Sequence, residues 1–183
     1  MMWARSLTGG MLAAAFTAGL AAASPAAQSA AVADLQAAFL LNFARFTQWP
    51  DARKGSTLVM CIAADDRLAD AVTKSIHGQA IEGRPLEMRR MRGGESAAPC
   101  HLLFVSKSLT AGAAPLLQDA RRQPVLTVSD REGFARSDGI IELFLERDRM
   151  RFAVNVELAR RARLHLSSRL LNLSKVVHGK PGF

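Results

Sequence analysis

The sequence predicts an α/β domain of three layers, with a mostly parallel central sheet, helices on both faces and a β-hairpin at one edge. Three near-continuous apolar runs indicate strands buried on both faces, which is typical of parallel sheets. They are residues 57–64, 101–105 and 124–128. The segments between them carry apolar residues at helical spacing, so strands and helices alternate as in βαβ units. At 183 residues the chain fits one such domain with a removable end.

The first residues have the features of a secretory signal peptide. A short start containing Arg5 precedes residues 7–23, which are apolar and rich in small side chains. Ala-x-Ala patterns at residues 21–23 and 31–33 place cleavage somewhere in 23–33. The alternative is an uncleaved anchor, but the apolar run is short for a hydrocarbon layer of about 30 Å. We therefore expect export, with a signal peptide in residues 1–33 and the α/β domain in residues 34–183.

The chain is basic, with a formal net charge of +8. Cleavage after residue 33 would remove Arg5 and no acidic residue, which would leave +7. A basic exported protein could meet nucleotides, acidic lipid or an acidic protein surface. Nucleic acid as a partner would need interleaved aromatic residues or a recognised module, and neither is visible.

The first helix of the domain is predicted from an apolar stripe that recurs at helical spacing. The stripe consists of Leu35, Phe39, Phe43 and Phe46. Asp34 is placed to cap this helix, and Trp49 ends it because the residue before Pro50 is pushed out of the helical region. The stripe is most simply core packing, whereas Trp49 and Pro50, at the helix exit, form a candidate partner-binding edge.

The two cysteines, Cys61 and Cys100, both lie in the expected mature chain. An even pair in an exported protein favours a disulfide, here between the middle of one strand and the start of another. Closing a loop of roughly 40 residues would stabilise the fold by about 4 kcal/mol in the chain-entropy model. The alternative is a metal site that includes His77 or His101, but the spacing matches no zinc pattern.

The middle of the chain reads as strand, helix, strand, helix. Asp65 and Asp66 follow the first buried strand and are interpreted as the start of a helix that Gly78 stops, not as a catalytic pair. A basic segment, residues 86–92, is part strand, and residues 108–122 are predicted to be helical.

The C-terminal third is predicted to contain a hairpin followed by two short helices. Residues 141–145 and 150–154 alternate between apolar and polar on either side of a charged link, as in a half-buried antiparallel pair. Asn155 and Ser167 are expected to cap the two helices, and residues 164–166 interrupt the helical period between them.

The break between these helices is the candidate ligand site. Arg163 and His165 are two residues apart in an extended segment, so their side chains should face the same way. Arg169 could turn toward the same anion, and the helix start at Ser167 offers free backbone N–H groups. The simpler interpretation, which stays open, is that Ser167 only caps the helix and the arginines are a solvated face.

No pattern in the sequence indicates catalysis or a cofactor. It contains no G-x-S-x-G, G-x-G-x-x-G or P-loop pattern, and its four histidines are scattered. We therefore expect a protein that is not an enzyme and needs no cofactor or metal.

Several segments resemble the YfiR family of periplasmic proteins. They are residues 35–50, the run 125–130, the loop with Phe134, residues 151–155, and residues 166–171. Cys61 and Cys100 fall where that family has a disulfide. The chain has Ser137-Asp138-Gly139 where the family usually shows two glycines, and it lacks the second cysteine pair of some members. The C-terminal part is also similar to half of a periplasmic binding protein.

The resemblance implies a periplasmic repressor. Such a protein would bind the periplasmic part of an inner-membrane diguanylate cyclase of the YfiN type and so control cyclic-di-GMP signalling and biofilm formation. An outer-membrane lipoprotein of the YfiB type would sequester the repressor, and the resemblance favours a homodimer. Two alternatives stay open: a small-ligand binding module for an anionic or aromatic molecule, and an enzyme.

Overall fold

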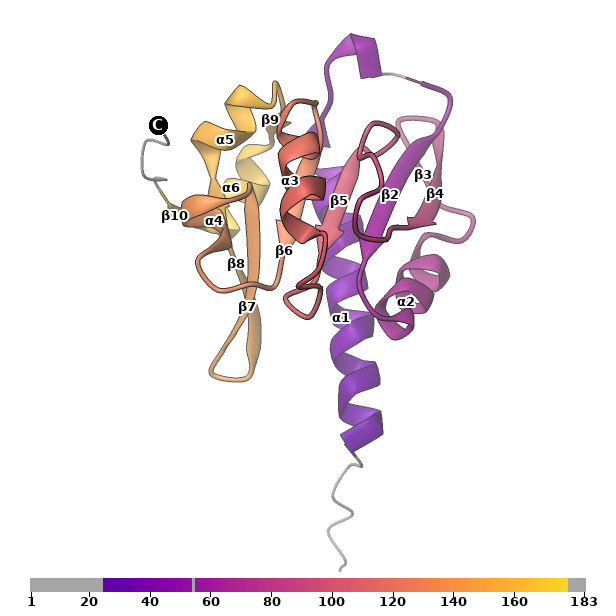
Figure 1. Ribbon diagram of the computed structural model, residues 1–183, viewed down its shortest axis with the longest axis vertical. Coiled ribbons are helices and arrows are strands. Elements are labelled where there is room, and N and C mark those ends of the chain that lie inside the picture. Colours follow the sequence, from indigo (N-terminus) through magenta and orange to yellow (C-terminus); the bar gives the residue numbers. More distant parts are fainter. Residues whose placement is uncertain (1–24, 54, 178–183) are drawn as a thin grey trace, which may run out of the picture.

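The computed structural model describes residues 25–53 and 55–177 and has three layers, α/β/α (Figure 1). The elements are, in chain order, α1 (Pro25–Arg45), β1 (Thr47–Gln48), η1 (Asp51–Arg53), β2 (Leu58–Ala63), α2 (Asp66–Ile76), β3 (Ala80–Ile81), β4 (Arg84–Arg90), β5 (Leu102–Val105), α3 (Ala113–Arg121), β6 (Leu126–Ser129), α4 (Phe134–Ser137), β7 (Ile141–Glu146), β8 (Arg149–Asn155), α5 (Val156–Arg161), β9 (His165–Leu166), α6 (Ser168–Leu173) and β10 (Lys175–Val177). The fold class, the three buried strands and the hairpin are confirmed.

In the described part of the chain the central sheet has eight strands, in the order β10-β8-β7-β6-β5-β2-β4-β3. The strands from β4 to β7 are parallel to their neighbours, and so is β10 to β8. The β7–β8 hairpin and the β3–β4 pair are antiparallel. The sequence did not indicate β10, which pairs outside the hairpin, because three residues carry too little pattern. β1 and β9 form a separate two-stranded ladder.

Alternate residues of the central strands enter two cores. One face packs against α1, α2, α5 and α6 through Leu58, Met60, Ile62, Leu102, Phe104, Leu126 and Val128. The opposite face packs against α3 and α4 through Cys61, Ala63, Leu103 and Val105. Figure 1 shows α3 in front of the sheet and α1 behind it. Burial on both faces explains why these strands read as continuous apolar runs.

The first helix is longer than the sequence analysis predicted. α1 begins at Pro25, so Asp34 lies inside the helix and the prediction that it is a cap was wrong. Alanine has the highest helix propensity and proline is favoured at a first helical position, which explains the earlier start. Leu35 is 42 % exposed, and the buried face consists instead of Ala33, Ala37, Leu40, Leu41, Phe43 and Ala44.

The other predicted caps are confirmed. Asp65, Asn155 and Ser167 each accept a hydrogen bond from the backbone N–H three residues on, at 3.1, 2.9 and 3.3 Å. The helix predicted for residues 108–122 begins only at Ala113, because Gly112 before it has a left-handed backbone with φ 76°. The side-chain oxygens of Asp65, Asn155 and Ser167 therefore satisfy backbone donors that the helices leave unpaired.

The loop that follows β6 holds a large apolar side chain in the smaller core. α4 forms within this loop, and Phe134 at its start is 1 % exposed. The Phe134 ring lies against Gly139: a Cβ atom added at Gly139 would be 2.0 Å from the ring carbon Cε1. Glycine at this position is thus required by close packing.

The predicted signal peptide falls mostly outside the described residues, which start at residue 25. One of the two cleavage patterns, residues 31–33, lies in α1. None of the described helices combines the length and apolarity needed to span a bilayer. The leader, its cleavage and the domain boundary at residue 34 stay predictions.

Candidate functional site

The residues predicted to bind a ligand lie on three consecutive elements. Arg163 follows α5, His165 lies in β9, Ser167 caps α6 and Arg169 lies in α6. The side chains of Arg163, His165 and Arg169 are exposed, and Arg163 has a left-handed backbone with φ 57°. A left-handed backbone is uncommon for a residue other than glycine. The segment is thus a fixed, basic and accessible part of the surface.

The β1–β9 ladder holds this segment against the end of α1. Gln48 pairs with His165, and the Ser167 backbone N–H donates to the Phe46 carbonyl at 2.9 Å. The Ser167 hydroxyl is engaged by its own helix. Within residues 25–53 and 55–177, no hydrogen bond or ion pair joins Arg163, His165 and Arg169. An anion site at these residues therefore stays a prediction.

Trp49 is part of the core and does not form an exposed edge. It is 5 % exposed, and its Nε1–H donates to the His101 carbonyl at 3.1 Å. Its ring meets the His101 ring nearly edge-on, with centroids 5.8 Å apart. Trp49 therefore cannot present its indole to a partner in this conformation, which corrects the basis of that expectation. Pro50 is partly exposed, and partner binding there stays a prediction.

The predicted disulfide between Cys61 and Cys100 is present, with Cα atoms 5.6 Å apart and both residues fully buried. Cys61 lies in mid-β2 and Cys100 precedes β5, as predicted. Because both sulfurs are bonded to each other, neither is a thiolate ligand. Among the described residues, no group of three or more His, Cys, Asp or Glu is placed to hold a metal.

Polar contacts fix the segment that carries Cys100. The Asp119 carboxylate accepts from the Ala97 backbone N–H at 2.7 Å and from the Ser96 hydroxyl at 2.9 Å. These hydrogen bonds hold the pKa of Asp119 below its usual value, the Ala97 bond most. The Arg53 guanidinium donates to the carbonyls of Ala98, at 2.8 Å, and of Cys100. The disulfide thus lies in a cross-linked loop, not at a mobile end.

His101 joins the loop after β1 to the sheet, and its hydrogen bonds select one tautomer of the neutral ring. The Val59 backbone N–H donates to Nδ1 at 3.1 Å, so Nδ1 has no proton. Nε2 lies 3.0 Å from the Arg53 carbonyl and therefore carries the proton that it donates. Burial lowers the pKa of His101 most, and the charges of Arg53 and Arg84 lower it further, against the raising effect of the Arg53 carbonyl.

We expect stability to fall when the pH falls from 7 through the ordinary histidine pKa of about 6.5. Because the pKa of His101 is lowered in the folded protein, the unfolded chain binds more protons in this range. The contribution of His101 to the free energy of unfolding is complete above the pKa that this residue has in the unfolded chain. It is lost as the pH falls toward the lower pKa that His101 has in the folded protein. Denaturant unfolding at pH 7 and pH 5.5 measures it. His101→Gln should flatten the dependence.

The structure also brings together residues that the sequence analysis did not combine. A cavity of about 530 Å³ lies at the carboxyl ends of β2, β5 and β6. Asp65, Ser106 and Asp130, each just beyond the end of one of these strands, line it. The signal was available in the sequence, because polar residues directly after parallel buried strands meet at one edge of the sheet.

Comparison with protein families gives one assignment. The sequence matches the family DUF4154, described as YfiR/HmsC-like, over residues 33–175. The chain belongs to the YfiR/HmsC-like family. The match begins in α1 and ends at the first residue of β10, so it includes the disulfide, both cores and the β1–β9 ladder. A comparison with curated proteins finds no match.

Membership of the YfiR/HmsC-like family confirms the resemblance read from the sequence. It supports, at the level of the family, a periplasmic regulator of diguanylate cyclase signalling. Members of this family are regulators and not enzymes.

Proposed function

We propose that this protein is a periplasmic negative regulator that binds the periplasmic part of an inner-membrane diguanylate cyclase of the YfiN type. Binding would hold the cyclase inactive and so control cyclic-di-GMP signalling and biofilm formation. The YfiR/HmsC-like family match over residues 33–175 carries this proposal. The predicted signal peptide and the buried disulfide support it, because disulfides persist in oxidising compartments such as the periplasm.

Further parts of the proposal concern the assembly. An outer-membrane lipoprotein of the YfiB type would relieve repression by sequestering the regulator. The family resemblance favours a homodimer, which a mass measurement of the mature chain in solution would test. The proposal includes no nucleic acid partner, no cofactor and no enzymatic turnover.

The test is capture of partners from detergent-solubilised envelope on the immobilised mature chain. We expect an inner-membrane protein with a diguanylate cyclase domain to be retained by the oxidised protein. Its periplasmic domain, produced separately, should bind directly with a measurable Kd. Deleting the gene for the regulator should raise cyclic-di-GMP, and restoring it should reverse the rise.

Failure of capture together with unchanged cyclic-di-GMP in the deletion strain would contradict the proposal. It would favour the alternative, a periplasmic module that binds a small anionic or aromatic ligand for another membrane sensor. The exposed side chains of Arg163, His165 and Arg169, next to the Ser167 cap, are the observation on which that alternative rests.

A further inference from the structure

The strand order identifies a crevice that the predictions above do not use. β2 connects through α2 to β4 on one side, and β5 connects through α3 to β6 on the other. β2 and β5 are neighbours, so the connections diverge between them. In open α/β sheets, ligands bind outside the carboxyl ends of the strands at such a switch point. The cavity of about 530 Å³ lies at this position.

The walls of this cavity arise because three strands end together while their neighbour continues. Ala63, Val105 and Ser129 are paired at the ends of β2, β5 and β6, and the floor is lined by Ala64, Phe104 and Ser106 at these strand ends. β7 pairs with β6 only as far as Glu142, whereas its pairing with β8 continues to Glu146. The hairpin therefore rises beyond the floor as one wall, and α1 provides another. Figure 1 shows the β7–β8 turn and the start of α1 projecting at the same end of the sheet.

The walls are apolar. Val32 of α1, Leu145 of β7 and Met150 of β8 line the cavity. Leu145 is 59 % exposed, whereas Leu143, two residues earlier on the same face of β7, is 1 % exposed. Cavities of about 300–1,000 Å³ with mainly apolar walls and a few polar groups are typical of small-molecule sites. The shape and the walls thus suit an apolar ligand body.

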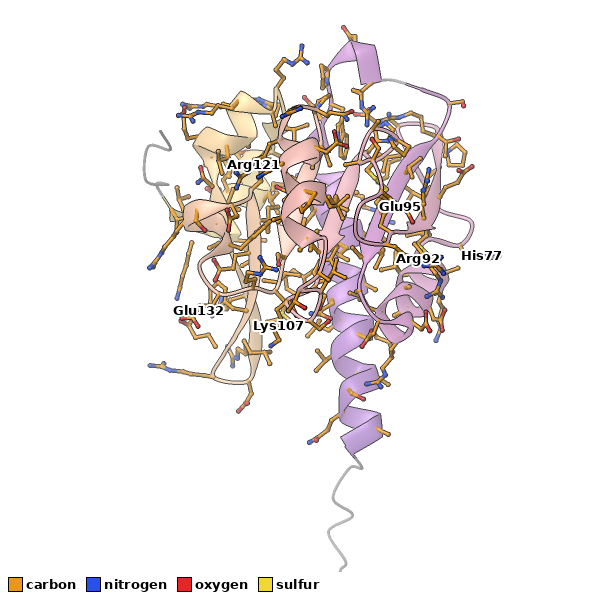
Figure 2. All side chains as sticks on the ribbon, viewed as in Figure 1. His77, Arg92, Glu95, Lys107, Arg121 and Glu132 are labelled. Carbon is orange, nitrogen blue, oxygen red and sulfur yellow. A yellow bond between two sulfur atoms is a disulfide. The ribbon has the colours of Figure 1, made fainter. Side chains whose placement is uncertain are left out.

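The charged groups at the floor differ in whether they already have a hydrogen-bond partner. The Asp65 carboxylate accepts from the Leu68 backbone N–H, and the Asp130 carboxylate accepts from the Lys107 backbone N–H at 2.6 Å. The Lys107 ammonium and the Arg67 guanidinium line the same cavity and have no partner among the described residues. Lys107 lies at the end of the sheet from which the hairpin turn projects (Figure 2). Both carboxylates keep their charge. Among the charged side chains that line the cavity, however, only the two cations lack a bonding partner in the described part of the chain, so they are the groups left to pair with an anion.

We propose that this crevice binds a small amphipathic anion, with its apolar body between α1 and the β7–β8 hairpin and its anionic group at Lys107 and Arg67. The site is separate from the predicted one at Arg163 and His165, and it does not depend on the proposed regulatory function. A carboxylate would form charge-assisted hydrogen bonds with the two cations. The apolar body would cover Leu145 and Val32, which are otherwise in contact with water.

Octanoate is a suitable probe, titrated by calorimetry and by two-dimensional NMR against the chain from residue 24, which is the product of cleavage at the first Ala-x-Ala pattern and retains Val32. We expect saturable binding, with amide shifts concentrated in residues 106–108 and 143–145. 1-Octanol, which lacks the charge, and octylammonium, which reverses it, should bind more weakly. Lys107→Ala should weaken octanoate binding about three- to tenfold, because the ion pair is partly solvated. Leu145→Asp should weaken it about tenfold, through lost apolar contact and charge repulsion.

Two control variants make the same types of substitution, lysine to alanine and leucine to aspartate, at positions outside the cavity. Lys74→Ala removes a lysine from the last turn of α2, and Leu173→Asp changes an exposed leucine of α6 that is 71 % exposed. Neither residue lines the cavity. Any one of three results would overturn the proposal. They are octanoate binding that does not saturate, equally strong binding of octylammonium, and control variants that weaken octanoate binding as much as Lys107→Ala and Leu145→Asp do. All four positions are exposed, and unchanged melting temperatures would confirm that the variants fold.

Discussion

Replacing both cysteines with alanine should lower the free energy of unfolding by about 4 kcal/mol. The Cys61–Cys100 bond spans 39 residues, and closing a loop of this length lowers the conformational entropy of the unfolded chain by an amount that corresponds to this value. Both sulfurs are fully buried between β2, β5 and α3, so the folded protein also loses packing. Chemical denaturation monitored by circular dichroism measures the difference, as a lower midpoint.

The single variants separate the effect of the cross-link from that of the side chains. Cys61→Ala and Cys100→Ala each break the bond, so each should lose nearly as much stability as the double variant. A double variant that loses less than about 1 kcal/mol would show that the cross-link does not constrain the unfolded chain as the entropy model requires. Wild-type protein unfolded and refolded under reducing conditions should behave like the double variant.

The burial of the disulfide also limits how a redox signal could act. We hypothesise that loss of the Cys61–Cys100 bond loosens the fold and weakens repression. A thiolate must reach a sulfur atom to reduce the bond, and neither sulfur is accessible in the folded state. Reduction should therefore proceed at the rate of local opening and speed up with denaturant. Equal stability and equal cyclase affinity of the Cys61→Ser/Cys100→Ser variant would contradict the hypothesis.

The sheet was predictable because its strands are buried on both sides. Apolar runs around Cys61, Leu103 and Thr127 have no competing interpretation once helical segments separate them. The three caps were predictable for a similar reason, since Asp65, Asn155 and Ser167 stand directly before helical periods. In each case a short stretch of sequence contains the whole physical cause.

The features that the sequence analysis missed depend on residues that lie far apart in the sequence. Trp49 is buried against His101, 52 residues away, to whose carbonyl its indole donates a hydrogen bond, so its position before Pro50 gave no indication of its burial. The crevice beside Leu145 depends on where β6 stops pairing with β7, which is a property of the sheet register. The early start of α1 is a different case, because the alanine-rich residues 25–33 were interpreted only as part of a leader.

A second large loss of stability is expected from a substitution in the loop after β6. Phe134→Ala should lower the free energy of unfolding by about 3–5 kcal/mol, because it empties a fully buried aromatic site in the smaller core. Phe144→Ala, at a partly exposed residue of β7, is the matched control and should cost much less. Denaturant midpoints of the two variants give the comparison. Similar losses for both would contradict the packing assigned to Phe134.

The contact between Phe134 and Gly139 makes a sharper test possible. Gly139→Ala alone should destabilise by about 1–3 kcal/mol, because the new methyl group would overlap the ring. Gly139 does not have a positive φ, so alanine brings no backbone strain. In the Phe134→Ala background the same methyl group enters the vacated space, and the double variant should be clearly more stable than the sum of the single changes predicts. Strictly additive losses would mean that the ring does not lie on Gly139. The conformation of this loop, whose Ala135 carbonyl accepts a hydrogen bond from the Asn155 side chain at 2.8 Å, would then need a different explanation.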